Sequence, residues 1–261
     1  MVKESFYLLL QMVKENPGAY LDKLSLTLLG YFIAGYGLRV SETYQGIQRI
    51  FVPGYHNYCM PYFQEFVFGR FNSGATTKNY IGVILEHTNS EEDAFYTFFE
   101  LLDEFWRSEH NNGAQSFSVQ LDKSMVHGVY HFLYSVRGNP KPYLGENRSL
   151  LSLRMLLDGY IMGHQEVDSG FHITSALDGF QDFVQNKFGT ASGLSWDQII
   201  VSRSSSDSEA FDKFYALLYE FRGIKMAFCN GEPIYLDRSE DLAQLKSILP
   251  PSVLIDGVDQ V

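Results

Sequence analysis

The sequence has few cysteines and lacks the short motifs that mark common classes of enzyme. Cys59 and Cys229 stand far apart in a chain of 261 residues, so neither a disulfide framework nor a cysteine metal knuckle is expected. The phosphate-binding glycine loop, the nucleophile elbow of hydrolases, the zinc-protease histidine pair and the complete dinucleotide fingerprint are also absent. We therefore expect a protein that is not an enzyme and binds no cofactor and no metal.

Long apolar runs and clusters of basic residues are missing as well. No stretch reaches the roughly 18 apolar residues of a membrane span, and no cleavable leader is recognisable at the N-terminus, so we expect a cytoplasmic protein that does not bind membranes. The net charge of −11 opposes binding to nucleic acid, because phosphates are contacted by clustered Lys and Arg. The same charge favours a basic protein as the partner.

The chain is rich in aromatic residues, with 21 Phe and 17 Tyr, and it contains an internal repeat. Four sequence blocks occur twice in the same order, about 120 residues apart. The first-copy blocks are 7–21, Gly35-Tyr36, 63–71 and 93–105, and their counterparts are 130–144, Gly159-Tyr160, 180–188 and 209–221. This recurrence predicts a tandem duplication, so each copy serves as an internal control for the other.

The fold class that we predict is mainly α, with two units of four to five helices packed as a pseudo-twofold pair and a small C-terminal β-hairpin. The predicted segments are a first helical repeat over 1–107, a linker over 108–123, a second helical repeat over 124–223 and a C-terminal segment over 224–261. The linker is polar and rich in turn residues. In the last segment Asn230-Gly231 favours a type I′ turn between two short strands, and a short helix over 239–249 follows.

Apolar spacing and capping residues predict where the helices lie. The first copy should have helices over 6–15, after the cap Ser25, over 63–71 and after the cap Ser90. Ser149 and Ser206 repeat the two caps in the second copy. Segments 80–85 and 196–201 suit either a short strand or a short helix, and the capping-box spacing of Ser195 and Gln198 favours the helix.

Residues that the second copy lacks are free for function, since the fold does not need them. On the last helix of the first copy, Glu92, Glu100 and Asp103 lie away from the stripe of Phe residues. Their counterparts are Ser208, Ala216 and Tyr219. This acidic side is either a solvated face or a docking patch for a basic partner.

A second region of this kind is the tyrosine-rich segment before the third helix, whose counterpart over 165–178 is plainer. Its candidate partner-binding residues are Tyr44, Tyr55, His56 and Tyr58, and Tyr62 follows them. Tyrosines on a loop are favoured binding anchors because they are large, stiff and amphipathic. They are equally suited to covering a core.

Two further sets of residues suggest chemistry less strongly. His127 and His131 are spaced to bind a metal from one helix face, but no third ligand is identifiable, so ordinary helix histidines are the preferred interpretation. Glu104 and Glu220 occupy the same place in both copies and are the pair of carboxylates that an enzyme would use.

The repeated motifs resemble those of a loosely defined group of small bacterial proteins. The resemblance is carried by Pro17-Gly18-Ala19-Tyr20-Leu21, by Gly35-Tyr36 and by the segment from Ala94 to Phe105. Acidic proteins of this kind without catalytic motifs look like immunity proteins, which bind and neutralise a cognate basic toxin domain. The alternative is a helical adaptor or regulator that binds a peptide or small ligand between the two repeats.

Overall fold

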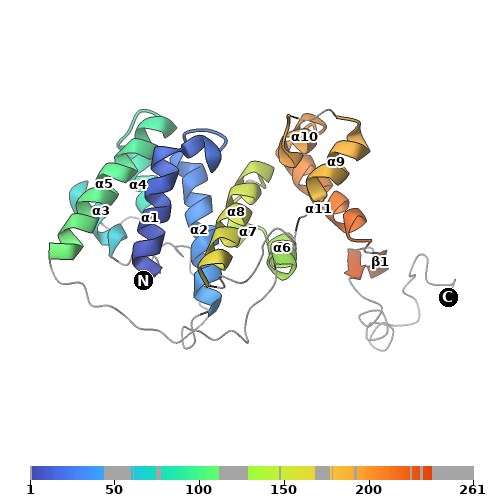
Figure 1. Cartoon of the computed structure of the whole chain (residues 1–261), viewed down its shortest axis with the longest axis horizontal. Coiled ribbons are helices and arrows are strands. Elements are labelled where there is room, and N and C mark those ends of the chain that lie inside the picture. The colour runs from blue at the N-terminus through green and yellow to red at the C-terminus, as the bar shows by residue number, and fades with distance from the viewer. Residues whose placement is uncertain are drawn as a thin grey trace. The chain divides into compact units, whose positions relative to one another are not determined.

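The computed structural model describes the following residues: 2–43, 60, 62–74, 78–111, 129–146, 148–167, 177, 179–190, 193–223, 225–229 and 232–236. The chain is mainly helical, as predicted, and it divides into two compact units, Met1–Ala176 and Leu177–Val261 (Figure 1). These units are defined by packing, whereas the predicted repeats are defined by recurring sequence. The repeat boundaries stay a prediction.

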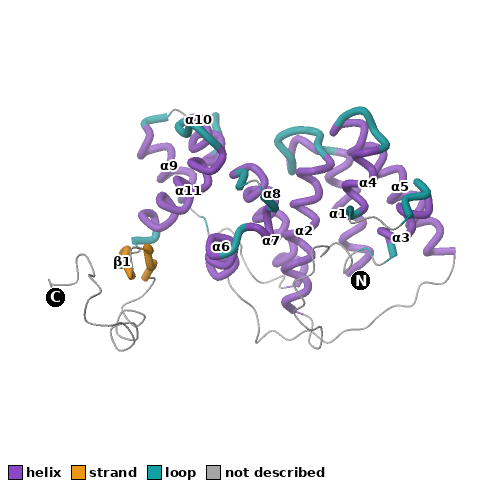
Figure 2. The backbone as a smooth tube through the Cα atoms, turned by 180° about the vertical axis from the view of Figure 1, so that it is seen from behind, coloured by secondary structure: helices purple, strands orange, loops and turns teal. Residues whose placement is uncertain are grey.

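The first unit contains α1 to α8. In chain order its elements are α1 (Val2–Glu15), the 3-10 turn η1 (Pro17–Ala19), α2 (Leu26–Thr43), α3 (Phe63–Arg70), α4 (Tyr80–Glu86), α5 (Glu91–Asn111), α6 (Val129–Gly138), α7 (Lys141–Leu144) and α8 (Leu150–Val167). The second unit contains α9 (Phe180–Phe188), α10 (Trp196–Ser202), α11 (Asp207–Phe221) and the strands β1 (Lys225–Cys229) and β2 (Glu232–Leu236). Figure 2 shows the same elements from behind.

Hydrogen bonds at the helix starts confirm three predicted caps. The Ser25 hydroxyl accepts from the backbone N–H of Leu28 at 3.2 Å, and Ser90 accepts from Asp93 at 3.0 Å. Ser206 receives the equivalent bond at the start of α11, at 3.2 Å. Each side chain satisfies an N–H group that the first helical turn leaves without a backbone partner.

The two ambiguous segments are helices, as the capping pattern favoured. Asn79 accepts from the N–H of Gly82 at 3.0 Å and begins α4. At the start of α10 the side-chain oxygen of Gln198 accepts from the N–H of Ser195 at 3.2 Å, which is one half of a capping box.

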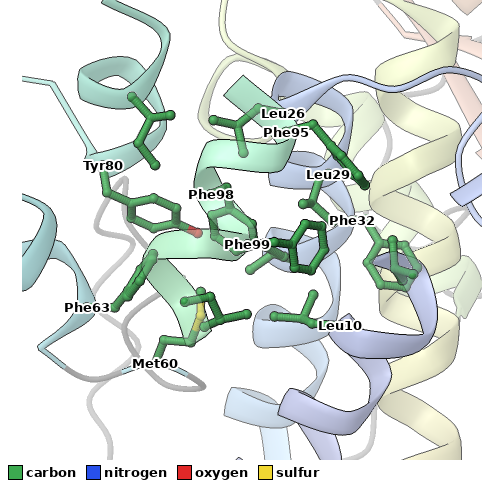
Figure 3. Close-up of a cluster of buried hydrophobic side chains, with 14 of the residues drawn as sticks. Leu10, Leu26, Leu29, Phe32, Met60, Phe63, Tyr80, Phe95, Phe98 and Phe99 are labelled. Atoms are coloured by element: carbon green, nitrogen blue, oxygen red, sulfur yellow. The ribbon is translucent and has the colours of Figure 1, made fainter. Parts of the chain in front are cut away.

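The core of the first unit combines aromatic rings of α3, α4 and α5 with apolar side chains of α1 and α2 (Figure 3). Phe63 of α3 lies 5.2 Å from Tyr80 of α4 and 5.6 Å from Phe98 of α5, both edge to face. All three side chains are at most 1% exposed. Edge-to-face contacts of this kind stabilise a core beyond the burial of apolar area alone, so these rings hold α3 and α4 against α5.

The second unit repeats this ring geometry. Phe63 meets Phe105 at 5.4 Å and 69°, and Phe180 meets Phe221 at 5.5 Å and 70°. Three more pairs recur in the same way: Phe63–Phe98 with Phe180–Phe214, Phe66–Phe105 with Phe183–Phe221, and Phe95–Phe99 with Phe211–Tyr215. Beyond the helices, β1 and β2 pair antiparallel, with Met226 opposite Tyr235.

In the first unit α2 and α8 lie side by side, with backbones close enough to require glycine (Figure 1). A Cβ on Gly35 would lie 1.9 Å from the carbonyl oxygen of Leu156, and a Cβ on Gly159 would lie 1.9 Å from that of Phe32. Arg39 is fully buried beside this contact and lies 6.0 Å from the ring centre of Tyr160. The glycines of the repeated Gly-Tyr motif are thus packing residues.

Several predicted features lie outside the described residues. They are the Asn230-Gly231 turn, the helix over 239–249 and most of the linker. The described part shows that α5 continues to Asn111, past the predicted start of the linker, and that α1 starts at Val2 rather than Phe6. Polar residues at these helix ends carry no apolar period, so the sequence pattern placed the boundaries too far inward.

We expect Gly35→Ala and Gly159→Ala each to destabilise the chain. The added methyl must push two backbones apart, and overpacking of this kind costs about 1–3 kcal/mol. The measurement is the urea midpoint of unfolding. Gly69→Ala in α3 is the matched control, because no described atom outside the neighbouring backbone of α3 lies within 4 Å of the added Cβ and alanine favours the helix. Unchanged midpoints for both interface variants would contradict the close packing.

Candidate interaction surface

One solvent-facing line of α5 carries two of the predicted partner-binding residues. Glu92 and Glu100 are exposed, and Tyr96 between them is 46% exposed. The spacing of four residues places the three side chains on one helix face, with the carboxylates about 12 Å apart along the axis. We call Glu92, Tyr96 and Glu100 the α5 stripe.

The second repeat has a different surface at the same place on α11. Its exposed residues there are Ser208, Asp212 and Ala216. The buried sides of the two helices match at Phe95 and Phe211, which are both fully buried. At the three positions of the α5 stripe the two helices differ on the side that faces solvent. Sequence reasoning missed Tyr96, although its spacing from Glu92 and Glu100 was a readable signal.

Asp103, in contrast, is a structural residue of the first unit. Its carboxylate accepts hydrogen bonds from Tyr7 at 3.0 Å, from Gln11 at 2.8 Å and from Lys14 at 2.8 Å, all on α1. The Tyr7 ring also stacks on Trp106 at 4.4 Å and 4°. Asp103 thus fastens α1 to α5, and its absence from the second repeat does not leave it free.

The electrostatics of Asp103 follow from these contacts. Burial by itself raises the pKa of the Asp103 carboxyl, but hydrogen bonds from Lys14, Gln11 and Tyr7 outweigh burial, so the pKa lies below its ordinary value. Burial and the hydrogen bond to Asp103 raise the pKa of the Tyr7 phenol. Asp103 is consequently charged at neutral pH and Tyr7 is a hydrogen-bond donor.

Glu91 has a similar structural role at the other end of α5. Its carboxylate accepts from the Ser25 hydroxyl at 2.8 Å and from the hydroxyl and N–H of Thr27, at 2.6 and 3.0 Å. Burial raises its pKa, but the bonds from Thr27 and Ser25 lower it further than burial raises it. Glu91 therefore caps α2 from a different helix, which separates it from the exposed acids that follow it.

The paired glutamates also have an explanation within the fold. Glu104 lies 3.4 Å from Arg70, and Glu220 forms the corresponding ion pair with Lys187. The first pair joins α3 to α5 and the second joins α9 to α11, and both lie at the protein surface. Each glutamate thus has an ion-pair partner within its own unit.

The structure leaves the tyrosine-rich segment untested. Tyr44, Tyr55, His56 and Tyr58 lie outside the described residues, as does His127.

On α1 the first repeat exposes two apolar side chains one turn apart, Leu8 at 62% and Met12 at 52%. The aligned residues of α6 are polar, His131 and Ser135.

No family model, no curated protein and no solved structure matches the chain. Within the described ranges, no group of three or more His, Cys, Asp or Glu residues is arranged to hold a metal ion. None of the helices described above has the length and apolar character needed to span a membrane.

We expect Asp103→Asn to lower the free energy of unfolding at pH 7 by about 1–2 kcal/mol, because the bonds from Lys14, Gln11 and Tyr7 lose their charged acceptor. The folded-state pKa is depressed, so the carboxylate stabilises fully above its unfolded pKa of about 3.9 and loses this effect as pH falls through the folded value. Urea unfolding between pH 7 and pH 2 measures the free energy of unfolding of both proteins. The difference between wild type and variant should shrink below about pH 4. Exposed Glu100→Gln should stay within about 0.5 kcal/mol at pH 7. A gap that grows on acidification would contradict the network.

Proposed function

We propose that this chain is an immunity protein that acts in the cytoplasm by binding a basic toxin domain, without catalysis. The observation that supports the proposal best is the α5 stripe, where the first repeat carries Glu92, Tyr96 and Glu100 on a helix whose buried aromatic positions are aromatic in both repeats. The net charge of −11 agrees with a basic partner.

The two kinds of side chain in the stripe would contribute in different ways. Exposed carboxylates on the rim of an interface mainly speed association and make it dependent on salt. A tyrosine that becomes buried slows dissociation, and an anchor of this kind is worth about 2 kcal/mol when it is a hot spot. In this proposal Glu92 and Glu100 attract the basic partner, and Tyr96 anchors it.

The division between the repeats supports a tandem duplication in which one copy diverged on its surface. The ring pairs of α3 and α5 recur in α9 and α11 with closely similar distances. The contact between α2 and α8 is reciprocal around Gly35 and Gly159, which is the pattern of an isologous interface. In this proposal the shared core belongs to the ancestral unit, and partner binding belongs to the first copy.

The decisive experiment compares charge changes at equivalent places in the two repeats. We expect Glu92→Gln with Glu100→Gln to slow association with a basic toxin domain, to be sought among the neighbouring genes, by about tenfold at low salt. Survival on co-expression with that toxin should fall accordingly. Binding rates at low and high salt measure the effect directly, and the difference should narrow as salt screens the charges.

The matched control is Ser208→Lys with Ala216→Lys on α11. Both pairs of changes raise the net charge of −11 by two charges, so a larger effect of the α5 pair assigns recognition to the first repeat. Equal effects of the two pairs would refute the α5 stripe as the binding site. A chain that neither binds nor protects against any neighbouring toxin would refute the function itself.

A further inference from the structure

The backbone before α3 adopts a conformation that a tyrosine disfavours. Tyr62 has φ 67° and ψ −1°, a left-handed geometry in which the Cβ of an L residue crowds the following carbonyl oxygen. The second repeat adopts the same geometry before α9, with φ 78° and ψ −8°, and has Gly179 there. Both repeats thus make the same left-handed turn, and only the first makes it with a bulky side chain.

A second left-handed position shows which residue types occupy such a turn elsewhere in the chain. Asn72, after α3, has φ 51°, and its counterpart after α9 is Gly189 with φ 60°. Asparagine visits this region more readily than other side chains because it can hydrogen-bond locally. Among the non-glycine residues that the structure describes, only Tyr62 and Asn72 have positive φ. Tyrosine is the disfavoured choice of the two.

Contacts within the described part of the chain do not compensate for the strain at Tyr62. Its side chain is 66% exposed, the highest value among the exposed large hydrophobic side chains there. It forms no hydrogen bond or ring contact with the described residues. The turn itself belongs to the fold, but a bulky side chain on it does not, and strain of this kind is found mainly at functional sites.

We infer that Tyr62 is a contact residue for the partner and that an arginine guanidinium group of that partner stacks on its exposed ring. The face of a phenol ring carries negative potential and attracts a cation. Glu65, exposed one turn along α3, adds a carboxylate nearby and offsets the positive end of the helix dipole. This inference rests on the proposed function, because it names the chemistry by which the same basic partner is recognised.

The first arm of the test measures strain in the full-length chain. Tyr62→Gly should raise the urea midpoint of unfolding by about 0.2 M, since relief of the left-handed strain exceeds the added flexibility of glycine in the unfolded state. The reverse change at the equivalent place, Gly179→Tyr, should lower the midpoint. A lower midpoint for Tyr62→Gly would give Tyr62 a role in the fold and overturn the inference.

The second arm measures recognition with a defined probe, an acetylated and amidated nonapeptide of three Gly-Arg-Gly units. Tyr62→Gly should weaken its binding about two- to fivefold, whereas Tyr62→Phe should bind as wild type does because it keeps the ring. All three chains carry the same charge, so general attraction to the acidic protein cancels. Binding by Tyr62→Gly equal to wild type, or an equal loss in Tyr62→Phe, would overturn the inference.

The probe separates this inference from the function on which it rests. If peptide binding depends on the Tyr62 ring, the contact is supported whether or not the chain protects against a toxin. If the wild-type chain protects against no toxin, only the immunity function is refuted. Protection by the wild type with peptide binding indifferent to Tyr62 supports immunity and refutes this contact.

Discussion

The close approach of α2 and α8 is the constraint on which the first compact unit depends. Gly35 and Gly159 each face a backbone carbonyl of the other helix at a distance that admits only a hydrogen atom. Gly163 extends the same contact, because a Cβ there would lie 2.9 Å from the Cβ of Arg39. A charged side chain as large as Arg39 is buried in this region because a glycine stands opposite it.

Away from that contact, aromatic geometry restrains both copies in the same way. The ring of Phe63 meets three surrounding rings edge to face, and Phe180 repeats the arrangement in the second unit. A change at any of these positions disturbs several edge-to-face contacts at once, since protein cores are close-packed. Tyr96 of α5 and Asp212 of α11, which differ at matching places, face solvent, where a side chain meets no such restriction.

The helices and their caps could be predicted from sequence because they depend on residues three or four positions apart. Apolar period and the caps Ser25, Ser90 and Ser206 are local signals, and the structure agrees with them. The role of Asp103 could not be predicted, because its partners lie on α1, about 90 residues away, and no local pattern records such contacts. The division into compact units has the same origin, since packing of α8 against α2 is a long-range event.

Asp103 also shows how an internal repeat must be used to find functional residues. A residue missing from the second copy is free for function only when the first copy does not use it in its own packing, and Asp103 fails that condition because three hydrogen bonds hold it. Tyr96 and Tyr62 differ from their counterparts and are solvent-exposed. Tyr62 meets a stricter condition, because the backbone disfavours it and the second copy has the residue that the backbone prefers. A strained residue whose counterpart is the unstrained glycine is thus a stronger indication of function than a charged residue. A charged surface residue changes the stability of the fold very little.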